Sequence, residues 1–135
     1  MPYRKETPPK ADSKTLRVLC AEDDPHIATL LKAGLVNAGH FVECVADGSD
    51  ALERIRAQPD FYDVLITDHR MPRSTGLMLV RHARDHGFTG RVLVHCSGLT
   101  ERDAAAYRAL AVDRLFEKPL QSAELLRIVS GIAKA

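Results

Sequence analysis

Five short apolar segments, each followed by a stretch with helical spacing of apolar residues, constrain the fold most. They span residues 15–22, 41–46, 63–67, 91–96 and 114–117. Short apolar runs of this kind are typical of strands buried in a parallel sheet. Strands that alternate with helices imply right-handed crossovers and helices on both faces. The sequence therefore predicts one doubly wound α/β domain with five strands and five helices.

Capping residues support the helices of this pattern. Asp24 can cap the helix after the first strand, and Ser49 or Asp50 is expected at the start of the second. Ser122 can cap the last helix, after residue 119. Serine and aspartate are favoured at these positions because their side-chain oxygens accept hydrogen bonds from free backbone N–H groups.

The composition is that of a globular domain of ordinary size. The chain has 135 residues, 45% hydrophobic and 27% charged, with a net charge of +1. This charge balance argues against direct nucleic-acid binding and against an electrostatic membrane anchor. No apolar run approaches the roughly 18 residues of a membrane-spanning helix. We expect a cytoplasmic protein.

The first 14 residues differ from the rest. They are polar, contain three prolines and lack the apolar core of a secretory signal. Such a segment buries too little surface to order itself. We therefore expect a disordered tail at 1–14 and a folded domain at 15–135.

Cysteines and histidines give no strong signal of chemistry. Cys20, Cys44 and Cys96 are widely spaced within apolar stretches, so buried free thiols are expected. The six histidines show no pairing at metal-ligand spacing with a suitable cluster, and His82 and His86 are expected to be surface residues. The other four are His26, His40, His69 and His95.

Charged residues follow the predicted strands where a ligand would bind. In open parallel sheets, ligands bind beyond the carboxyl ends of the strands. Glu22 and Asp23 follow the first strand, Asp68 the third and Lys118 the fifth. Each has an ordinary interpretation alone: helix capping, a turn, or a solvated charge. These do not explain why all the charges fall on one edge of the sheet.

Together these side chains suit phosphoryl transfer. Carboxylates brought together repel one another unless a cation lies between them, and oxygen ligands suit Mg²⁺. A lysine supplies a compact positive charge for a phosphoryl group. Ser97, after the fourth strand, adds a hydroxyl, and a carboxylate is available as nucleophile.

Four motifs at these strand ends resemble those of the receiver domains of two-component response regulators. The type that they resemble is the single-domain receiver similar to chemotaxis regulators. They are "CAEDDP", "LITDHRMP" followed by a glycine, "SG" and "EKP". The resemblance covers residue 15 to the C-terminus. It implies a flavodoxin-like sheet with strand order 2-1-3-4-5.

The resemblance also assigns roles. It implies that Asp68 is the phosphoacceptor, and that Glu22 and Asp23 bind Mg²⁺ together with Asp68 and the backbone carbonyl of Arg70. Lys118 would pair with the phosphoryl group, and the peptide bond between Lys118 and Pro119 would be cis.

The family has a serine or threonine whose hydroxyl meets the phosphoryl oxygen, and two neighbouring residues of this chain could match it. Counting back from Lys118 can place either Cys96 or Ser97 there; we favour Ser97 because a thiol is a poorer donor. The family usually carries an aromatic residue three positions before the lysine, where this chain has Leu115. The adjacent Phe116 is expected in the core, because successive strand residues face opposite sides.

The predicted function is a phosphoacceptor, not an enzyme acting on external substrates. A histidine kinase or phosphotransfer protein would supply the phosphoryl group, and a downstream protein would respond. Two alternatives are a Mg²⁺-dependent phosphatase with an aspartate nucleophile and a pseudo-receiver that works without phosphorylation. The first would need an acid two residues after Asp68, where Arg70 stands; the second usually lacks the acids or the lysine, which are present.

Overall fold

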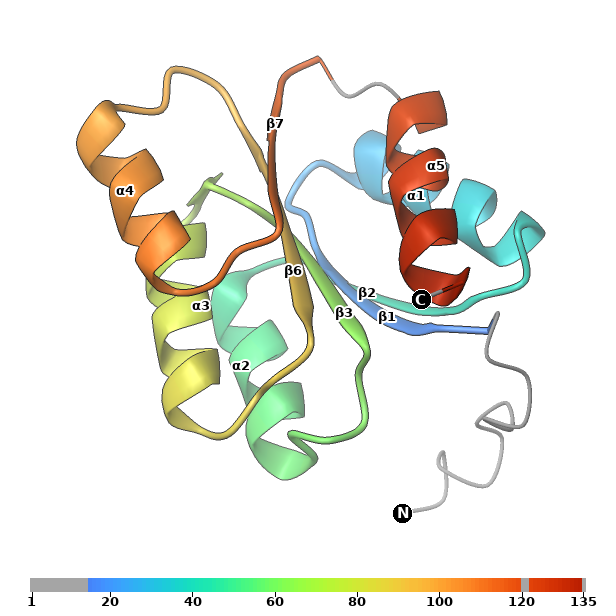
Figure 1. Ribbon diagram of the computed structural model, residues 1–135, viewed down its shortest axis with the longest axis horizontal. Coiled ribbons are helices and arrows are strands. Elements are labelled where there is room, and N and C mark those ends of the chain that lie inside the picture. Colours follow the sequence, from blue (N-terminus) through green and yellow to red (C-terminus); the bar gives the residue numbers. More distant parts are fainter. Residues whose placement is uncertain (1–14, 120–121, 135) are drawn as a thin grey trace.

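The computed structural model describes residues 15–119 and 122–134, and it contains the predicted α/β domain (Figure 1). The prediction for residues 1–14 lies outside the described residues. In chain order the elements are β1 (Arg17–Ala21), α1 (Pro25–Asn37), β2 (Phe41–Val45), α2 (Gly48–Ala57), β3 (Val64–Asp68), β4 (Arg70–Met71), β5 (Ser74–Thr75), α3 (Gly76–Asp85), β6 (Arg91–Cys96), α4 (Glu101–Ala109), β7 (Arg114–Glu117) and α5 (Ser122–Lys134).

Five parallel strands form the main sheet in the order β2-β1-β3-β6-β7. Numbered along the chain, this is the predicted order 2-1-3-4-5, which is confirmed. Helices α1 and α5 cover one face of the sheet, and α2, α3 and α4 cover the other (Figure 1). The strand order reverses between β1 and β3, so the carboxyl ends of these two strands flank the expected ligand site.

Two apolar clusters, one on each face, hold the sheet. In β3 every residue is buried: Val64 and Ile66 pack into the cluster below α1 and α5, and Leu65 packs into the other. Since side chains alternate along a strand, Asp68 shares the face of Val64 and Ile66. Phe116 is buried in that same cluster, which confirms its predicted place in the core.

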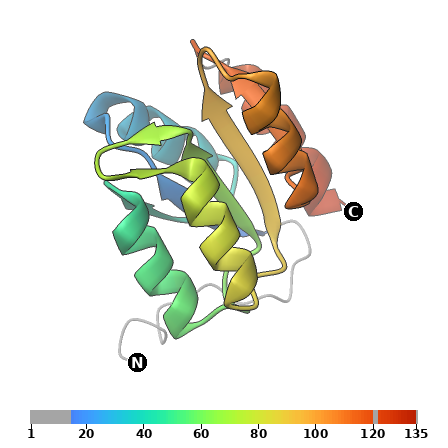
Figure 2. The same ribbon diagram turned by 90° about the vertical axis from the view of Figure 1, so that its left-hand side faces the viewer.

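The sequence interpretation missed two local features. A two-stranded antiparallel hairpin, β4 with β5, occupies part of the segment expected to be a loop after β3. Figure 2 shows this hairpin at the end of the molecule where β6 also ends. The N-cap of α2 is Asp47, whose side chain accepts a hydrogen bond from the backbone N–H of Asp50. Ser49 and Asp50, the predicted caps, lie within the helix.

The predicted cap of α1 is confirmed, and the prediction of buried free thiols is confirmed in part. Asp24 caps α1 by accepting hydrogen bonds from the backbone N–H groups of His26 and Ile27, as predicted. The three cysteines are free thiols, and Cys20 and Cys96 are buried; Cys44 is only partly buried, contrary to expectation. Within the described ranges, the helices are too short or too polar to span a bilayer.

Candidate functional site

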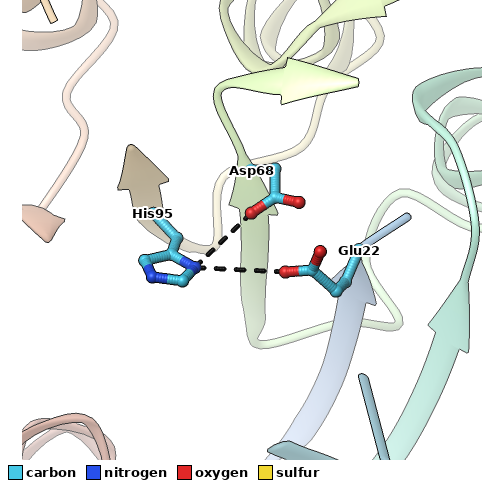
Figure 3. Close-up of side chains that lie close together, drawn as sticks. All are labelled: Glu22, Asp68 and His95. Atoms are coloured by element: carbon cyan, nitrogen blue, oxygen red, sulfur yellow. Dashed lines mark ion pairs between the residues drawn. The ribbon is translucent and has the colours of Figure 1, made fainter. Parts of the chain in front are cut away.

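Three neighbouring strands bring one buried side chain each to the carboxyl edge of the sheet: Glu22 follows β1, Asp68 ends β3, and His95 lies near the end of β6 (Figure 3). Asp68 and His95 are register partners in the parallel pair of β3 and β6. The alternation of side chains turns these residues toward the α1 and α5 side, because Cys20, Ile66 and Leu93, two positions before each, pack there.

The three side chains lie within reach of a common centre. His95 Nδ1 is 3.4 Å from Asp68 Oδ1 and 4.0 Å from Glu22 Oε1. One potential ligand atom from each residue lies within 4.8 Å of the other two. All three residues are at least 96% buried. The three side chains therefore form a small buried polar cluster beside the apolar core.

Lys118 approaches the same carboxylate from the end of β7. Its Nζ is 3.4 Å from Asp68 Oδ1, and its side chain is about one-third exposed at 34%. Its backbone N–H donates to the Cys96 carbonyl at 2.8 Å, which fixes it beside β6. The Lys118–Pro119 bond is cis, as the resemblance implied.

Burial and mutual repulsion govern the ionisation of the two acids. Burial raises the pKa of Asp68, and the neighbouring Glu22 raises it further, while the His95 imidazole and Lys118 oppose the rise. Burial also disfavours ionised Glu22, but His95, Asp68 and the Asp24 backbone N–H together lower its pKa. The Asp24 N–H donates to Glu22 Oε2 at 3.0 Å. Glu22 is therefore the acid whose charge is better supported.

The His95 imidazole lies between these acids. Burial favours its neutral form, but contact with Asp68 and then Glu22 outweighs burial and raises the pKa of His95. Both ring nitrogens of His95 and both carboxylate oxygens of Asp68 are buried without a hydrogen-bond partner. Buried polar atoms are rarely left unpaired, because each costs about 1–3 kcal/mol. Four such atoms in one place indicate a site built for a ligand.

The other predicted metal ligands lie at the margin of this cluster. Asp23 is exposed on the segment between β1 and α1, outside the group formed by Glu22, Asp68 and His95. Arg70 lies in β4, two residues beyond Asp68, with an exposed side chain. The structure thus brings Glu22, Asp68 and Lys118 together, while Asp23 and Arg70 are exposed and lie outside the buried cluster.

The two candidates for the hydroxyl position differ in their surroundings. Cys96 is the last residue of β6 and is buried, and its thiol donates to the Phe116 carbonyl at 3.3 Å. Ser97 is exposed just beyond the strand. Leu115, which stands at the usual aromatic position, is partly buried against the α2 and α3 side of the core.

His95 is the site residue that the sequence interpretation missed. We expected no histidine to pair with a suitable cluster, and this is wrong for His95. A signal was present: His95 is the penultimate residue of a predicted buried strand, so its side chain had to lie inside. The register that puts it opposite Asp68 is a property of the folded sheet.

This arrangement suits a divalent cation together with an anionic group that carries oxygen atoms. Two carboxylates and open lone pairs favour a divalent cation, and an ammonium beside Asp68 favours an anionic group. A buried carboxylate with unpaired oxygens can also act as a nucleophile.

A family model described as "Response regulator receiver domain" matches residues 18–130, nearly all of the chain. The response regulator protein PmrA of Pseudomonas aeruginosa is 37% identical over 98 residues, covering 73% of this chain and 42% of PmrA. The chain spans about half the length of the curated relatives it matches.

Solved structures agree with the family model. The chemotaxis protein CheY4 of Vibrio cholerae superposes with a TM-score of 0.77 at 26% identity, covering 87% of this chain and 98% of that one. A CheY-like receiver domain from Methanospirillum hungatei gives a TM-score of 0.82 at 20% identity, covering 89% and 94%. The second similarity concerns the fold alone.

Proposed function

The chain belongs to the response regulator receiver family of two-component signalling, and on that premise we propose that Asp68 accepts a phosphoryl group and that its phosphorylation switches protein contacts. The observation that carries this proposal is the 3.4 Å approach of Lys118 Nζ to Oδ1 of the buried Asp68. A nucleophilic carboxylate with an adjacent cation is the minimum needed to receive a phosphoryl group.

In the proposed reaction a carboxylate oxygen of Asp68 attacks the phosphorus of a phosphohistidine donor. The new O–P bond forms as the P–N bond breaks, and the imidazole nitrogen of the donor keeps the electron pair. The product is an acyl phosphate on Asp68. Water later attacks that phosphorus, which regenerates the carboxylate and releases inorganic phosphate.

The chain's other residues would hold the group that moves. The Lys118 ammonium would offset the negative charge on the phosphoryl oxygens, and it opposes the burial that raises the pKa of Asp68. The Ser97 hydroxyl would donate a hydrogen bond to a phosphoryl oxygen. Its exposure supports this role, and the Cys96 thiol is already engaged with the Phe116 carbonyl.

Mg²⁺ fits the acids of this site. The oxygens of Asp68 and the neighbouring Glu22 are hard ligands, and the exposed Asp23 and the backbone carbonyl of Arg70 would complete the set. These four residues would hold the ion, which when bound neutralises charge on the phosphoryl group. The chain would act as a signalling phosphoacceptor, promoting only its own modification and its reversal.

Partners and location follow from this role. The donor would be a sensor histidine kinase or a histidine phosphotransfer protein, and the recipient of the signal a downstream protein, in the cytoplasm. We propose no direct contact with nucleic acid or membrane. An aspartate-nucleophile phosphatase is disfavoured because Arg70 stands where that chemistry needs an acid.

Acetyl phosphate tests the proposal without a known kinase. The protein is incubated with this phosphodonor and Mg²⁺, and its intact mass is measured at once at neutral pH. We expect a single phosphoryl addition, lost on hydroxylamine treatment, as acyl phosphates are. Asp68→Asn should show no addition, whereas Asp60→Asn, at an exposed acid outside the site, should behave as wild type. An adduct that persists in Asp68→Asn would overturn the proposal.

A further inference from the structure

His95 has no task in the phosphoacceptor chemistry proposed above, yet it is the most unusual residue of the site. It is 3% exposed, and neither ring nitrogen has a hydrogen-bond partner. Its Nδ1 is directed between Asp68 and Glu22 (Figure 3). Burying an imidazole without partners costs free energy, so its presence calls for a ligand or a fixed charge.

The distance between His95 and Asp68 matches that between two ligands of a single metal ion, and Glu22 lies somewhat farther away. Two ligands held at about 2.1 Å on a tetrahedral ion lie about 3.4 Å apart, and somewhat closer on an octahedral one. His95 Nδ1 and Asp68 Oδ1 are 3.4 Å apart, and Nδ1 and Glu22 Oε1 are 4.0 Å apart. Only small side-chain rotations are needed for all three atoms to reach one ion.

The donor set decides which ions such a site prefers. Mg²⁺ takes oxygen ligands and water almost exclusively, whereas an imidazole nitrogen suits first-row transition ions. Two carboxylates and one imidazole on neighbouring strands give an NO₂ donor set, to which solvent or a phosphoryl oxygen could add.

We propose that Glu22, Asp68 and His95 form a mixed nitrogen and oxygen site for a divalent first-row transition ion, with His95 Nδ1 as a direct ligand. The inference rests on the proposed function in that Asp68 serves both, and it names a different class of ion for the same pocket. Lys118 contacts the same Asp68 oxygen, and its long, partly exposed side chain leaves it free to shift when an ion binds.

The competing explanation is that His95 is only a buried counter-ion for the two acids. In that case the imidazole keeps both protons and cannot ligate. The two explanations differ in what Mn²⁺ experiences when it binds, so the test measures the metal's surroundings and does not depend on phosphorylation.

Mn²⁺ is the probe, added to the full 135-residue chain. Its binding is followed by the loss of the free-ion EPR signal, with Mg²⁺ as competitor. We expect Mn²⁺ to bind at least about tenfold more tightly than Mg²⁺, since the nitrogen ligand favours the transition ion. Pulsed EPR of the bound ion should show ¹⁴N modulation from one imidazole. That modulation should change to the ¹⁵N pattern when the protein is labelled with ¹⁵N-histidine.

Variants identify which histidine is responsible. His95→Val should abolish the nitrogen modulation and reduce the preference for Mn²⁺ over Mg²⁺ by about tenfold. His82→Gln, at an exposed position on α3, should leave both unchanged. If His95→Val fails to fold, as judged by circular dichroism, His95→Gln, which keeps a polar side chain, is measured in its place and should likewise lose the imidazole modulation.

The outcomes separate this inference from the proposed function. Bound Mn²⁺ without histidine nitrogen coupling, or no preference over Mg²⁺, overturns the metal site even if acetyl phosphate modifies Asp68. Nitrogen coupling that persists in His95→Val also overturns it. Nitrogen coupling from His95 in a protein that acetyl phosphate does not modify keeps the metal site and contradicts the phosphoacceptor.

Discussion

The hydroxyl of Tyr107 lies 2.6 Å from Nδ1 of His69, and this contact joins helix α4 to the residue that directly follows Asp68. Tyr107 is fully buried and His69 is 95% buried. On its other side, His69 Nε2 is 3.6 Å from a carboxylate oxygen of Asp103, also on α4. Burial raises the pKa of Tyr107, so the hydroxyl stays protonated. The position of α4 is therefore coupled to the backbone next to Asp68.

Removing that hydroxyl should destabilise the domain. Tyr107→Phe leaves a buried ring nitrogen of His69 without its partner, at a cost of about 1–3 kcal/mol in the free energy of unfolding. Urea unfolding followed by circular dichroism measures it. A double-mutant cycle with His69→Leu isolates the contact. Strictly additive effects of the two substitutions would show that the two side chains are not coupled.

Gly76 permits a close approach that no other residue would allow. A Cβ at this position would lie 2.9 Å from the Tyr107 hydroxyl and would overlap the carbonyl oxygen of Asp68. The Gly76 N–H donates to the His69 carbonyl at 2.7 Å, so the chain is held tightly there.

We therefore expect Gly76→Ala to lower the free energy of unfolding by about 1–3 kcal/mol and to slow modification of Asp68 by acetyl phosphate. Gly131→Ala, in helix α5, is the matched control, because a Cβ added there would meet no other atom within 4 Å. It should stabilise the domain by up to about 1 kcal/mol, since glycine is unfavourable within helices. Equal effects of the two substitutions would contradict the argument.

The strands and the strand-end acids could be predicted because both follow from local pattern, whereas the order of the strands was implied by the resemblance to receiver domains. Apolar runs define β3, and Asp68 follows directly in sequence. His95 could not be assigned in the same way: its neighbours along the chain are apolar, and its partners, Asp68 and Glu22, are brought to it by register across three strands. The hairpin β4–β5 was missed because each of its strands has only two residues.

Arg84 shows a further limit of sequence pattern. On α3 it has the appearance of a surface arginine, but its guanidinium donates to four backbone carbonyls within 3.2 Å. The acceptors belong to Phe88, Gly90, Leu110 and Ala111. These bonds join the loop after α3 to the end of α4. A charge that serves tertiary backbone groups has no signature in the local sequence.

Arg84→Met should therefore cost about 2–4 kcal/mol in the free energy of unfolding, because four carbonyls lose charge-assisted donors and three of these hydrogen bonds are partly buried. Arg84→Lys should recover only part of this loss, since an ammonium cannot match the planar fork. Arg81→Met, at an exposed position on the same helix, should change stability by less than about 0.5 kcal/mol. Urea unfolding of the three variants ranks them directly, and full rescue by lysine would rule out the geometric explanation.

Cys44 should be the reactive thiol of this protein. It faces Cys20 across the parallel pair of β1 and β2, where the two residues are register partners. The neighbouring Cys20 thiol, helped by the charge of Lys32, outweighs burial and lowers the pKa of Cys44 to about 7, while the pKa of Cys20 is raised. A lowered pKa means that the thiolate is present above pH 7 and is lost as the pH falls below it.

The rate of alkylation by iodoacetamide, followed peptide by peptide, checks this expectation. Cys44 should react with a midpoint near pH 7, whereas Cys20 and Cys96 should stay unmodified in the folded protein because they are buried. Cys20→Ala removes the neighbouring thiol, so the midpoint for Cys44 should rise toward the ordinary thiol value of about 8.5. Cys96→Ala should leave it unchanged. A midpoint that does not respond to Cys20→Ala would show that the neighbouring thiol is not the cause.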